Sequence, residues 1–362
     1  MTDYTDKSKS TVVCKQIRWK QIPDVPENES KHFVEGIFSY CGAGSPETKK
    51  GISILGYSFN SDMKDTFFYS SDGDFLIVPQ VGDLKIRTEM GLLVVCIGEF
   101  GVIPRGIKFQ MVVEGPKTQH SGWICEVFGN HLHLPELGPI GANGLANPQD
   151  FEIPTAAYKD VQDGSFRIIA KVLGEFFVSD TNNHPCDVVA WRGNYYPFKY
   201  NLRKFNVMNS VSFDHPDPSI FTVMSAMSST AGVAVLDFAV FKQRFMVAEN
   251  TFRPPYFHRN TMSEFMGNIY GEYDAKPSGG FEPGCSSLHL AMTPHGPETT
   301  ATEKAMNEEL KPVKYKDTMA FMFETCFVLR IAHSANENNA VVEIDQDYHK
   351  CWNGMKKHFI KD

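Results

Sequence analysis

The sequence lacks a surplus of positive charge and has no long apolar run. Its 35 Lys and Arg residues stand against 43 Asp and Glu, a net charge of −8, which argues against a broad electrostatic grip on nucleic acid or an anionic membrane. The longest apolar stretches, such as GLLVVCIG, are too short to span a bilayer, and the opening MTDYTDKSKS lacks the apolar core of a secretory signal. We therefore expect a soluble, cytoplasmic protein with no nucleic-acid and no membrane partner.

The cysteines lack any pairing pattern. There is no Cys-x-x-Cys spacing among the eight, which are Cys14, Cys41, Cys96, Cys125, Cys186, Cys285, Cys326 and Cys351. In a chain without a secretory signal, scattered cysteines are best interpreted as reduced, small apolar residues. A zinc site built from cysteines is disfavoured by this spacing.

What the sequence has is a β pattern with a few helical segments. Segments such as GISILGYSF, DFLIVPQ and IKFQMVVE are rich in β-branched and aromatic residues and are separated by Gly, Pro, Asp and Ser, and the pattern returns after residue 207. TATEKAMNEEL predicts a short helix with a capping box between Thr300 and Glu303. The tail DQDYHKCWNGMKKHF has helical spacing and predicts an amphipathic C-terminal helix.

The β segments fall into two groups. The turn Pro104 to Gly106 resembles one found in cupin barrels, and no histidine cluster accompanies it. We therefore expect a mainly β protein made of two cupin-like barrel or sandwich domains. Residues 1–203 would form an N-terminal domain without a metal site, and residues 204–362 a C-terminal domain that binds metal.

The stretch PPYFHRNTMSEF places His258 and Glu264 six residues apart. On a helix that offset turns about 600° and separates the side chains, whereas an even offset on a strand puts both on one face. We expect a strand that offers an imidazole and a carboxylate, either as metal ligands or as a buried hydrogen-bonded pair. Two imidazoles and one carboxylate form the facial ligand set of non-haem Fe(II) oxygenases, although zinc accepts the same set. Spacing alone leaves the second imidazole open between His289 and His295.

Longer strings resemble one family. FRPPYFHRNTMSEFMG, GGFEPGCSSLHLAMTPHGPE, LGPIGANGLANPQDF, VVAWRGNYYPFKYNL and FDHPDPSIFTV are similar to homogentisate 1,2-dioxygenase, and the resemblance runs from about Ile17 to the C-terminus. It implies that His258, Glu264 and His295 are the iron ligands, with His295 also lining the substrate site. It further implies that His215 handles a proton and Tyr273 contacts substrate. His289 would then lie just behind the ligands and orient one of them or the substrate.

The resemblance implies an Fe(II) enzyme that cleaves the ring of homogentisate with O2 to give maleylacetoacetate, in tyrosine and phenylalanine breakdown. It also implies a homo-oligomer, a hexamer built as a dimer of trimers. The family's usual N-terminal stretch is absent before Ile17, and Cys285 stands where the family usually has glycine. The missing stretch leaves one alternative open, a catalytically silent cupin that serves as a binding or structural protein. A second alternative is a related dioxygenase that acts on another dihydroxyphenyl acid such as gentisate.

Overall fold

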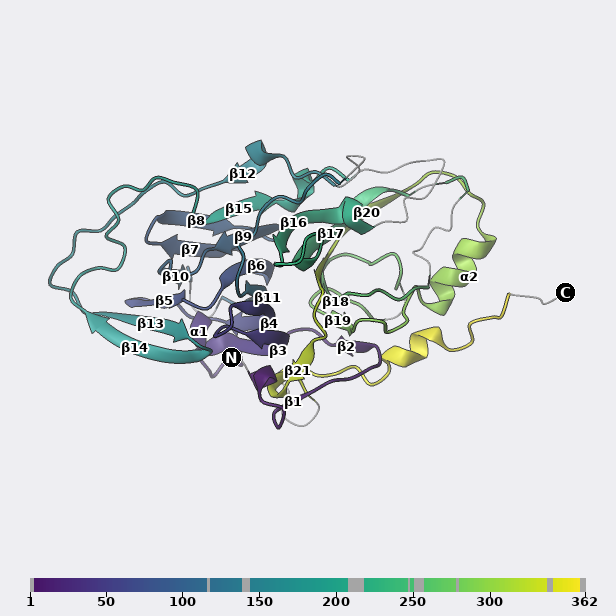
Figure 1. Ribbon diagram of the computed structural model, residues 1–362, viewed down its shortest axis with the longest axis horizontal. Coiled ribbons are helices and arrows are strands. Elements are labelled where there is room, and N and C mark those ends of the chain that lie inside the picture. Colours follow the sequence, from purple (N-terminus) through teal and green to yellow (C-terminus); the bar gives the residue numbers. More distant parts are fainter. Residues whose placement is uncertain are drawn as a thin grey trace.

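The structure is a computed structural model. It describes residues 3–115, 118–138, 144–207, 218–246, 248–250, 257–277, 280–336 and 341–358. Within these ranges the chain is built mainly of β-strands arranged in three sheets (Figure 1).

The largest sheet, here called the central sheet, has nine strands. Their spatial order is β1 (Ser10–Thr11), β21 (Arg330–Ala332), β3 (Ile37–Ser45), β4 (Lys50–Phe59), β11 (His120–Val127), β6 (Asp74–Val81), β9 (Glu99–Ile103), β15 (Phe198–Asn201) and β12 (Phe151–Glu152).

Two six-stranded sheets accompany it. The outer sheet runs in the order β14 (Glu175–Thr181), β13 (Phe166–Val172), β5 (Thr66–Ser70), β10 (Phe109–Val112), β7 (Leu84–Thr88) and β8 (Gly91–Val95). The site sheet runs in the order β16 (Thr222–Met227), β17 (Ala234–Met246), β20 (Val313–Thr325), β18 (Ser263–Tyr270), β19 (Ser286–His289) and β2 (Ile17–Trp19).

The described helices are short. The two α-helices are α1 (Phe33–Gly36) and α2 (Thr299–Asn307). The 3-10 helices are η1 (Asp3–Thr5), η2 (Pro148–Asp150), η3 (Leu202–Lys204), η4 (Pro218–Phe221), η5 (His333–Ala335) and η6 (Tyr348–Trp352).

The central sheet is buried on both faces. Successive side chains of a strand point to opposite faces, so neighbours on one strand enter different cores. Leu55 and Ile77 pack with the outer sheet, while Ile54 and Leu76 pack with the site sheet. This double burial explains why segments such as GISILGYSF are apolar almost throughout instead of alternating with polar residues.

The site sheet also has two different faces. Phe265 of β18 and Leu288 of β19 belong to the core shared with the central sheet. Their neighbours Glu264 and His289 point to the opposite face, which also carries Met266 and supports a separate apolar cluster with the loop residues between β18 and β19. Glu264 and His289 therefore lie on the face of the site sheet that points away from the central sheet.

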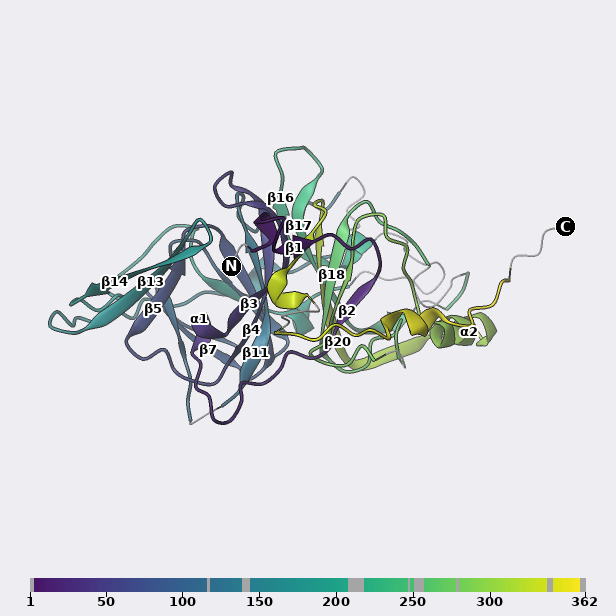
Figure 2. The same ribbon diagram turned by 90° about the horizontal axis from the view of Figure 1, so that it is seen from below.

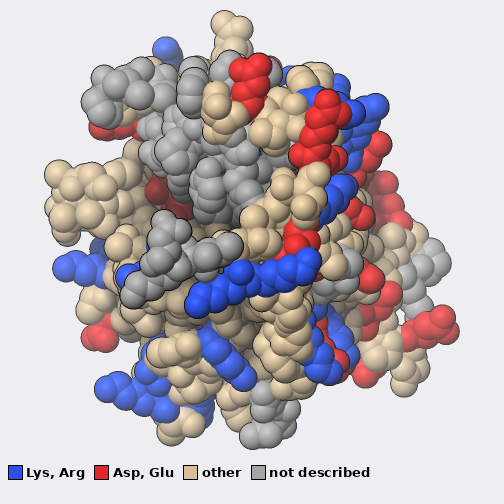
Figure 3. Space-filling model, turned by 90° about the vertical axis from the view of Figure 1, so that its right-hand side faces the viewer, with Lys and Arg blue, Asp and Glu red and all other residues tan. Residues whose placement is uncertain are grey.

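Both views show an elongated molecule. The hairpin of β13 and β14 lies at one end, and α2 with the C-terminal segment lies at the other (Figures 1 and 2). The end of the molecule that carries α2 has charged side chains of both signs. Neither the positive Lys and Arg nor the negative Asp and Glu cover this end (Figure 3).

The fold class expected from the sequence, mainly β with two sandwich-like units and a few short helices, is confirmed. Helix α2 is also present, although its first turn differs from the expected capping box. The N-cap is Glu298, whose carboxylate accepts from the Thr300 hydroxyl at 2.5 Å and makes no capping hydrogen bond to a backbone N–H of the first turn.

The expected C-terminal helix is shorter than predicted. Within the described part of the tail, which ends at residue 358, only Tyr348–Trp352 are helical, as a 3-10 turn that ends at Asn353. Gly354 follows with a φ of +76°, a left-handed conformation that stops a right-handed helix and that glycine adopts without steric cost. In the described part of the tail, the helical spacing therefore reflects one buried side chain, Tyr348, and not a continuous amphipathic face.

Candidate metal centre

The three side chains of the candidate site come from two segments that lie next to each other. Glu264 is the second residue of β18, in register with His289 of β19 and Glu324 of β20. His258 precedes β18, and His295 follows β19. The latter two are joined by an isolated antiparallel bridge, in which each backbone N–H donates to the other residue's carbonyl at 2.8 Å.

The expectation that His258 and Glu264 share one strand is wrong. The chain bends at Thr261 and Met262 before β18 begins. The Asn260 side-chain oxygen accepts from the Met262 N–H at 3.1 Å, a local bond that competes with strand pairing. The bend brings His258 back toward Glu264, so the two meet by a turn of the chain and not by strand periodicity.

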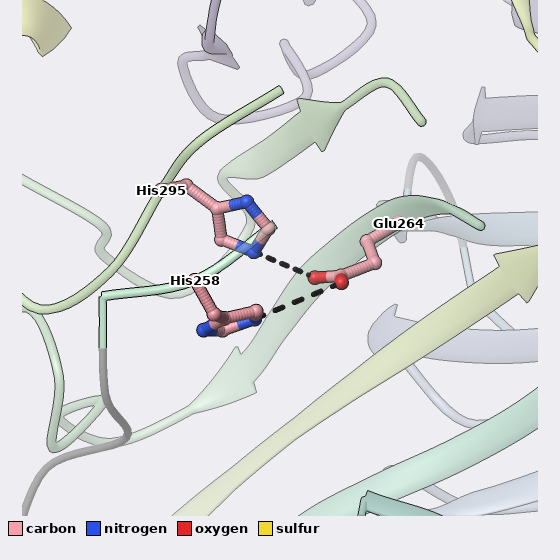
Figure 4. Close-up of side chains that lie close together, drawn as sticks. All are labelled: His258, Glu264 and His295. Carbon is pink, nitrogen blue, oxygen red and sulfur yellow. Dashed lines mark hydrogen bonds and ion pairs between the residues drawn. The ribbon is translucent and has the colours of Figure 1, made fainter. Parts of the chain in front are cut away.

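The carboxylate of Glu264 faces both imidazoles (Figure 4). One oxygen lies 2.9 Å from Nε2 of His295, and the other lies 3.9 Å from Nε2 of His258. One donor atom from each of the three residues lies within 4.8 Å of the other two. Glu264 and His295 are buried, whereas 43% of the His258 side chain is exposed, so the cluster is open on the His258 side.

The hydrogen bonding of His295 fits a bound cation. Its Nδ1 lies 3.0 Å from the carbonyl oxygen of Thr293, and its Nε2 faces the Glu264 carboxylate. Both partners are acceptors, but a neutral imidazole carries only one N–H. If Nδ1 donates to the carbonyl, the Nε2 lone pair points at a carboxylate, an arrangement that a divalent cation between them would stabilise. Neutral imidazole and carboxylate are donors that both Fe(II) and Zn(II) accept.

Glu264 is prepared to act as an anionic ligand. Burial raises the pKa of its carboxyl, but the contacts with His258 and His295 lower it more, and the net pKa lies well below the usual range. Asn260 donates to the same carboxylate at 3.2 Å and also donates to Glu324, which fixes the orientation of the group. An ionised, oriented carboxylate is what metal binding requires.

Tyr273 lies in the apolar cluster on the same face of the site sheet. It is buried beside Phe281 and Phe241, with ring centroids 5.7 Å and 6.1 Å away. Burial, with the neighbouring Asp274 carboxylate, raises the pKa of its hydroxyl far above the usual range, so the hydroxyl stays protonated and able to donate. Cys285 belongs to the same cluster, and burial raises the pKa of its thiol to about 11, as expected for a packing residue.

His289 lies directly against the ligand group. Its ring stacks on that of His295 with centroids 4.0 Å apart and planes 9° apart. His295, and not His289, contributes a ring nitrogen to the group that surrounds the Glu264 carboxylate. His215 lies outside the described residues.

Sequence reasoning missed three residues that the structure brings to the site: Asn260, Lys276 and Tyr348. Asn260 lies between the two ligands in HRNTMSE, where an Asx turn could have been expected from the residue type. Lys276 is one lysine in a polar loop, and Tyr348 was expected only to pack a helix. Neither had a local signal, because the contact of Lys276 with Tyr348 and that of Tyr348 with His289 depend on tertiary packing.

Family models match almost the whole chain. The N-terminal model of homogentisate 1,2-dioxygenase matches residues 2–202, and the C-terminal model matches residues 203–359. The homogentisate 1,2-dioxygenase of Dictyostelium discoideum is 52% identical over 342 residues, which cover 94% of this chain and 77% of that protein. The Caenorhabditis elegans enzyme of that name is 50% identical, with 95% and 77% covered.

The chain belongs to the homogentisate 1,2-dioxygenase family. This is a family of ring-cleaving dioxygenases, as the sequence strings indicated. The chain spans about three-quarters of the length of these relatives, and 74% of the Rhizobium etli protein, to which it is 49% identical.

Two solved structures are weakly similar to this chain. One is a cupin 2 conserved barrel domain protein from Leptotrichia buccalis, with a TM-score of 0.35 and 11% identity. The match covers 83% of this chain and 92% of that chain. Another is salicylate 1,2-dioxygenase from Pseudoaminobacter salicylatoxidans with gentisate, with a TM-score of 0.35, 8% identity, and 93% and 86% covered. No helix among the described residues is long and apolar enough to cross a membrane.

Proposed function

We propose that this member of the family is an active homogentisate 1,2-dioxygenase that uses Fe(II) and O2 to form maleylacetoacetate. The observation that carries the proposal is the convergence of His258, Glu264 and His295 on one point of the site sheet in a chain of this family. When bound, Fe(II) would supply the redox chemistry with O2 and a positive charge that favours an anionic aromatic acid.

The residues of the chain would divide the remaining work. His258, Glu264 and His295 would hold the metal, and the exposed side of His258 would leave room for substrate to enter. Tyr273 would donate a hydrogen bond to the substrate from an apolar wall, where one polar contact is enough to fix orientation. His215 would accept a proton from a ring hydroxyl, a role that suits a group whose ordinary pKa lies near neutrality.

The wider setting is proposed on the family resemblance. We place the reaction in tyrosine and phenylalanine breakdown in the cytoplasm, in a hexamer made of two trimers. We also keep the division into an N-terminal unit, residues 1–203, without a metal site and a C-terminal unit, residues 204–362, with one. The clustering of all three proposed ligands after residue 204 supports that division.

Oxygen uptake tests the proposal directly. The protein would be purified without oxygen, loaded with Fe(II), and given homogentisate or gentisate while absorbance reports the ring-cleaved product. We expect uptake with homogentisate that matches product formation and is lost in His258→Ala. His133→Ala, which changes an exposed histidine away from the cluster, is the control. Uptake only with gentisate would reassign the substrate, and bound iron without uptake on either acid would favour a silent protein.

A further inference from the structure

A buried lysine lies close to the ligand group. Lys276 belongs to the loop between β18 and β19, and it is only 6% exposed. Its Nζ contacts the hydroxyl of Tyr348 and lies 4.8 Å from the centre of that ring. The rings of Phe281 and Trp352 lie 5.8 Å away, so aromatic faces surround the ammonium group. Burial lowers its pKa to about 8, which leaves it mainly charged at neutral pH.

The lysine sets the direction of the next hydrogen bond. An ammonium group offers donors only, so the Tyr348 hydroxyl accepts from Lys276. The hydroxyl proton is then free to point at the other close partner, Nε2 of His289, at 2.8 Å. The chain of donors therefore runs from Lys276 through Tyr348 to His289.

His289 receives this bond as a neutral ring. A ring nitrogen that accepts a hydrogen bond carries no proton, so an imidazole that accepts from Tyr348 holds its single proton on the other nitrogen. Because Nε2 accepts from Tyr348, that proton is on Nδ1. Nδ1 is buried and has no hydrogen-bond partner among the described residues. A buried N–H without a partner is unfavourable and rare in native proteins, so this one is expected to have a partner in the working enzyme.

The position of His289 points to that use. It lies opposite Glu264 in the pairing of β18 with β19, so both side chains leave the sheet on the same face. Its ring also stacks on the ring of His295. The unpaired donor therefore lies beside the proposed metal and the space that a chelating substrate would occupy.

We propose that Lys276 and Tyr348 are positioning residues that fix the tautomer of His289, so that Nδ1–H donates to an oxygen of the bound aromatic acid. This inference rests on the proposed function for the identity of the acceptor. The tautomer itself is a property of the metal-free protein and is tested separately.

The first experiment measures the tautomer. Metal-free protein labelled with 15N-histidine is examined by solid-state NMR, and the signal that disappears in His289→Asn identifies this residue. We expect a protonated Nδ1 and an unprotonated Nε2, with the signal shifted in Tyr348→Phe and unshifted in Tyr57→Phe. Tyr57 is a fully buried tyrosine in the core beneath the outer sheet and serves as the matched control. A His289 protonated on Nε2 would overturn the proposal.

The second experiment separates positioning from structural support in the iron-loaded enzyme. Tyr348→Phe should lower kcat/KM for homogentisate by about 10–100-fold, the range expected for loss of an outer partner of a metal site. His289→Asn retains an amide N–H near the position of Nδ1 without help from Tyr348. In that background Tyr348→Phe should therefore cause less than about a twofold further loss.

The outcomes are distinct. An equal loss from Tyr348→Phe in both backgrounds would show that the hydroxyl acts through packing alone, and would overturn the proposal. Tyr348→Phe alone leaves the buried Lys276 ammonium without its acceptor and can therefore destabilise the fold. The double variant Lys276→Met, Tyr348→Phe removes both partners, so its activity reports the loss of the hydroxyl without an unpaired buried charge. If wild type consumed no oxygen with homogentisate, the proposed function would fail, while the spectra of the metal-free protein would still decide the tautomer.

Discussion

The first and second halves of the molecule each bury a glutamate, and they neutralise it differently. Glu126 of β11 is fully buried and meets the ammonium of Lys171 at 2.8 Å, with Asp72 on the same lysine at 2.6 Å and the Ser70 hydroxyl donating at 2.5 Å. Glu264 meets two imidazoles, one of which is buried and the other 43% exposed.

The difference separates a structural network from a binding site. The carboxylate pair around Lys171 has its cation inside the fold, with further bonds from Leu173 N–H at 2.6 Å and Gly174 N–H at 2.8 Å to Asp72. Around Glu264, imidazole nitrogens and carboxylate oxygens converge on one point. A buried carboxylate paired with a lysine stabilises the fold, whereas one that faces two imidazoles can take part in binding an ion from outside.

The largest effect is expected for Glu264→Gln. The substitution keeps the shape and removes the charge, so iron affinity should collapse and oxygen uptake should fall by about a thousandfold or more, the equivalent of several kcal/mol of metal-derived stabilisation. Oxygen uptake and iron content by mass spectrometry check it. Glu309→Gln, at a side chain that is 81% exposed, should leave both unchanged. Retention of full activity in Glu264→Gln would contradict the ligand assignment.

The second prediction concerns the other buried network. Lys171→Met leaves Glu126 and Asp72 buried without their cation, and should lower the free energy of unfolding by about 3–5 kcal/mol. Urea unfolding followed by circular dichroism measures this. The folded fraction should bind iron as well as wild type does. Adding Glu126→Gln should restore part of the stability, and a further loss instead would show that the network is not organised around the lysine.

Metal removal sharpens the comparison further. At a free iron concentration one hundred times the dissociation constant, wild type should gain about 2.7 kcal/mol of stability over the chelated protein. Thermal unfolding under anaerobic conditions reports the gain. Lys171→Met should show the same gain from its lower baseline, and Glu264→Gln should show none. Equal gains in wild type and Glu264→Gln would place the ion elsewhere.

The smallest effect is a pH dependence that originates from Lys276. Its pKa is about 8 in the folded protein, against an ordinary value of 10.5, so between these values the unfolded chain binds more protons than the folded one. Stability contributed by this residue therefore rises with pH through that window. Relative to Lys276→Met, wild type should gain about 1–2 kcal/mol between roughly pH 7.5 and pH 9.5. A constant difference in urea unfolding would show an unperturbed lysine.

The sequence predicted those features that depend on local pattern or on long family strings. GISILGYSF and DFLIVPQ are strands because their composition is typical of buried strands, and α2 lies where the helical segment was expected. Composition could not reveal that one sheet is shared by both cores. That arrangement depends on which face each strand presents to which partner.

The candidate site also has features that the sequence predicted and features that it could not predict. Residue types and family strings indicated His258, Glu264 and His295, and the structure brings them together. Strand periodicity gave the wrong reason for the meeting of His258 with Glu264, because the bend after Asn260 is a tertiary arrangement fixed partly by Glu324. Lys276 and Tyr348 are 72 residues apart and meet only in the folded protein, so no local pattern could pair them.

The short strand β2 has a consequence for how the protein is made. Ile17–Trp19 pair with β19 and complete the edge of the site sheet, while β21 from the C-terminal half pairs with β3 in the central sheet. Arg18 also lies over the Tyr348 ring, 4.6 Å from its centre. The residues of β2 are thus synthesised long before the residues of β19 with which they pair, and the same holds for β3 and β21. Such distant pairings slow folding and leave the edges of the earlier strands exposed in the nascent chain until the later strands have been made.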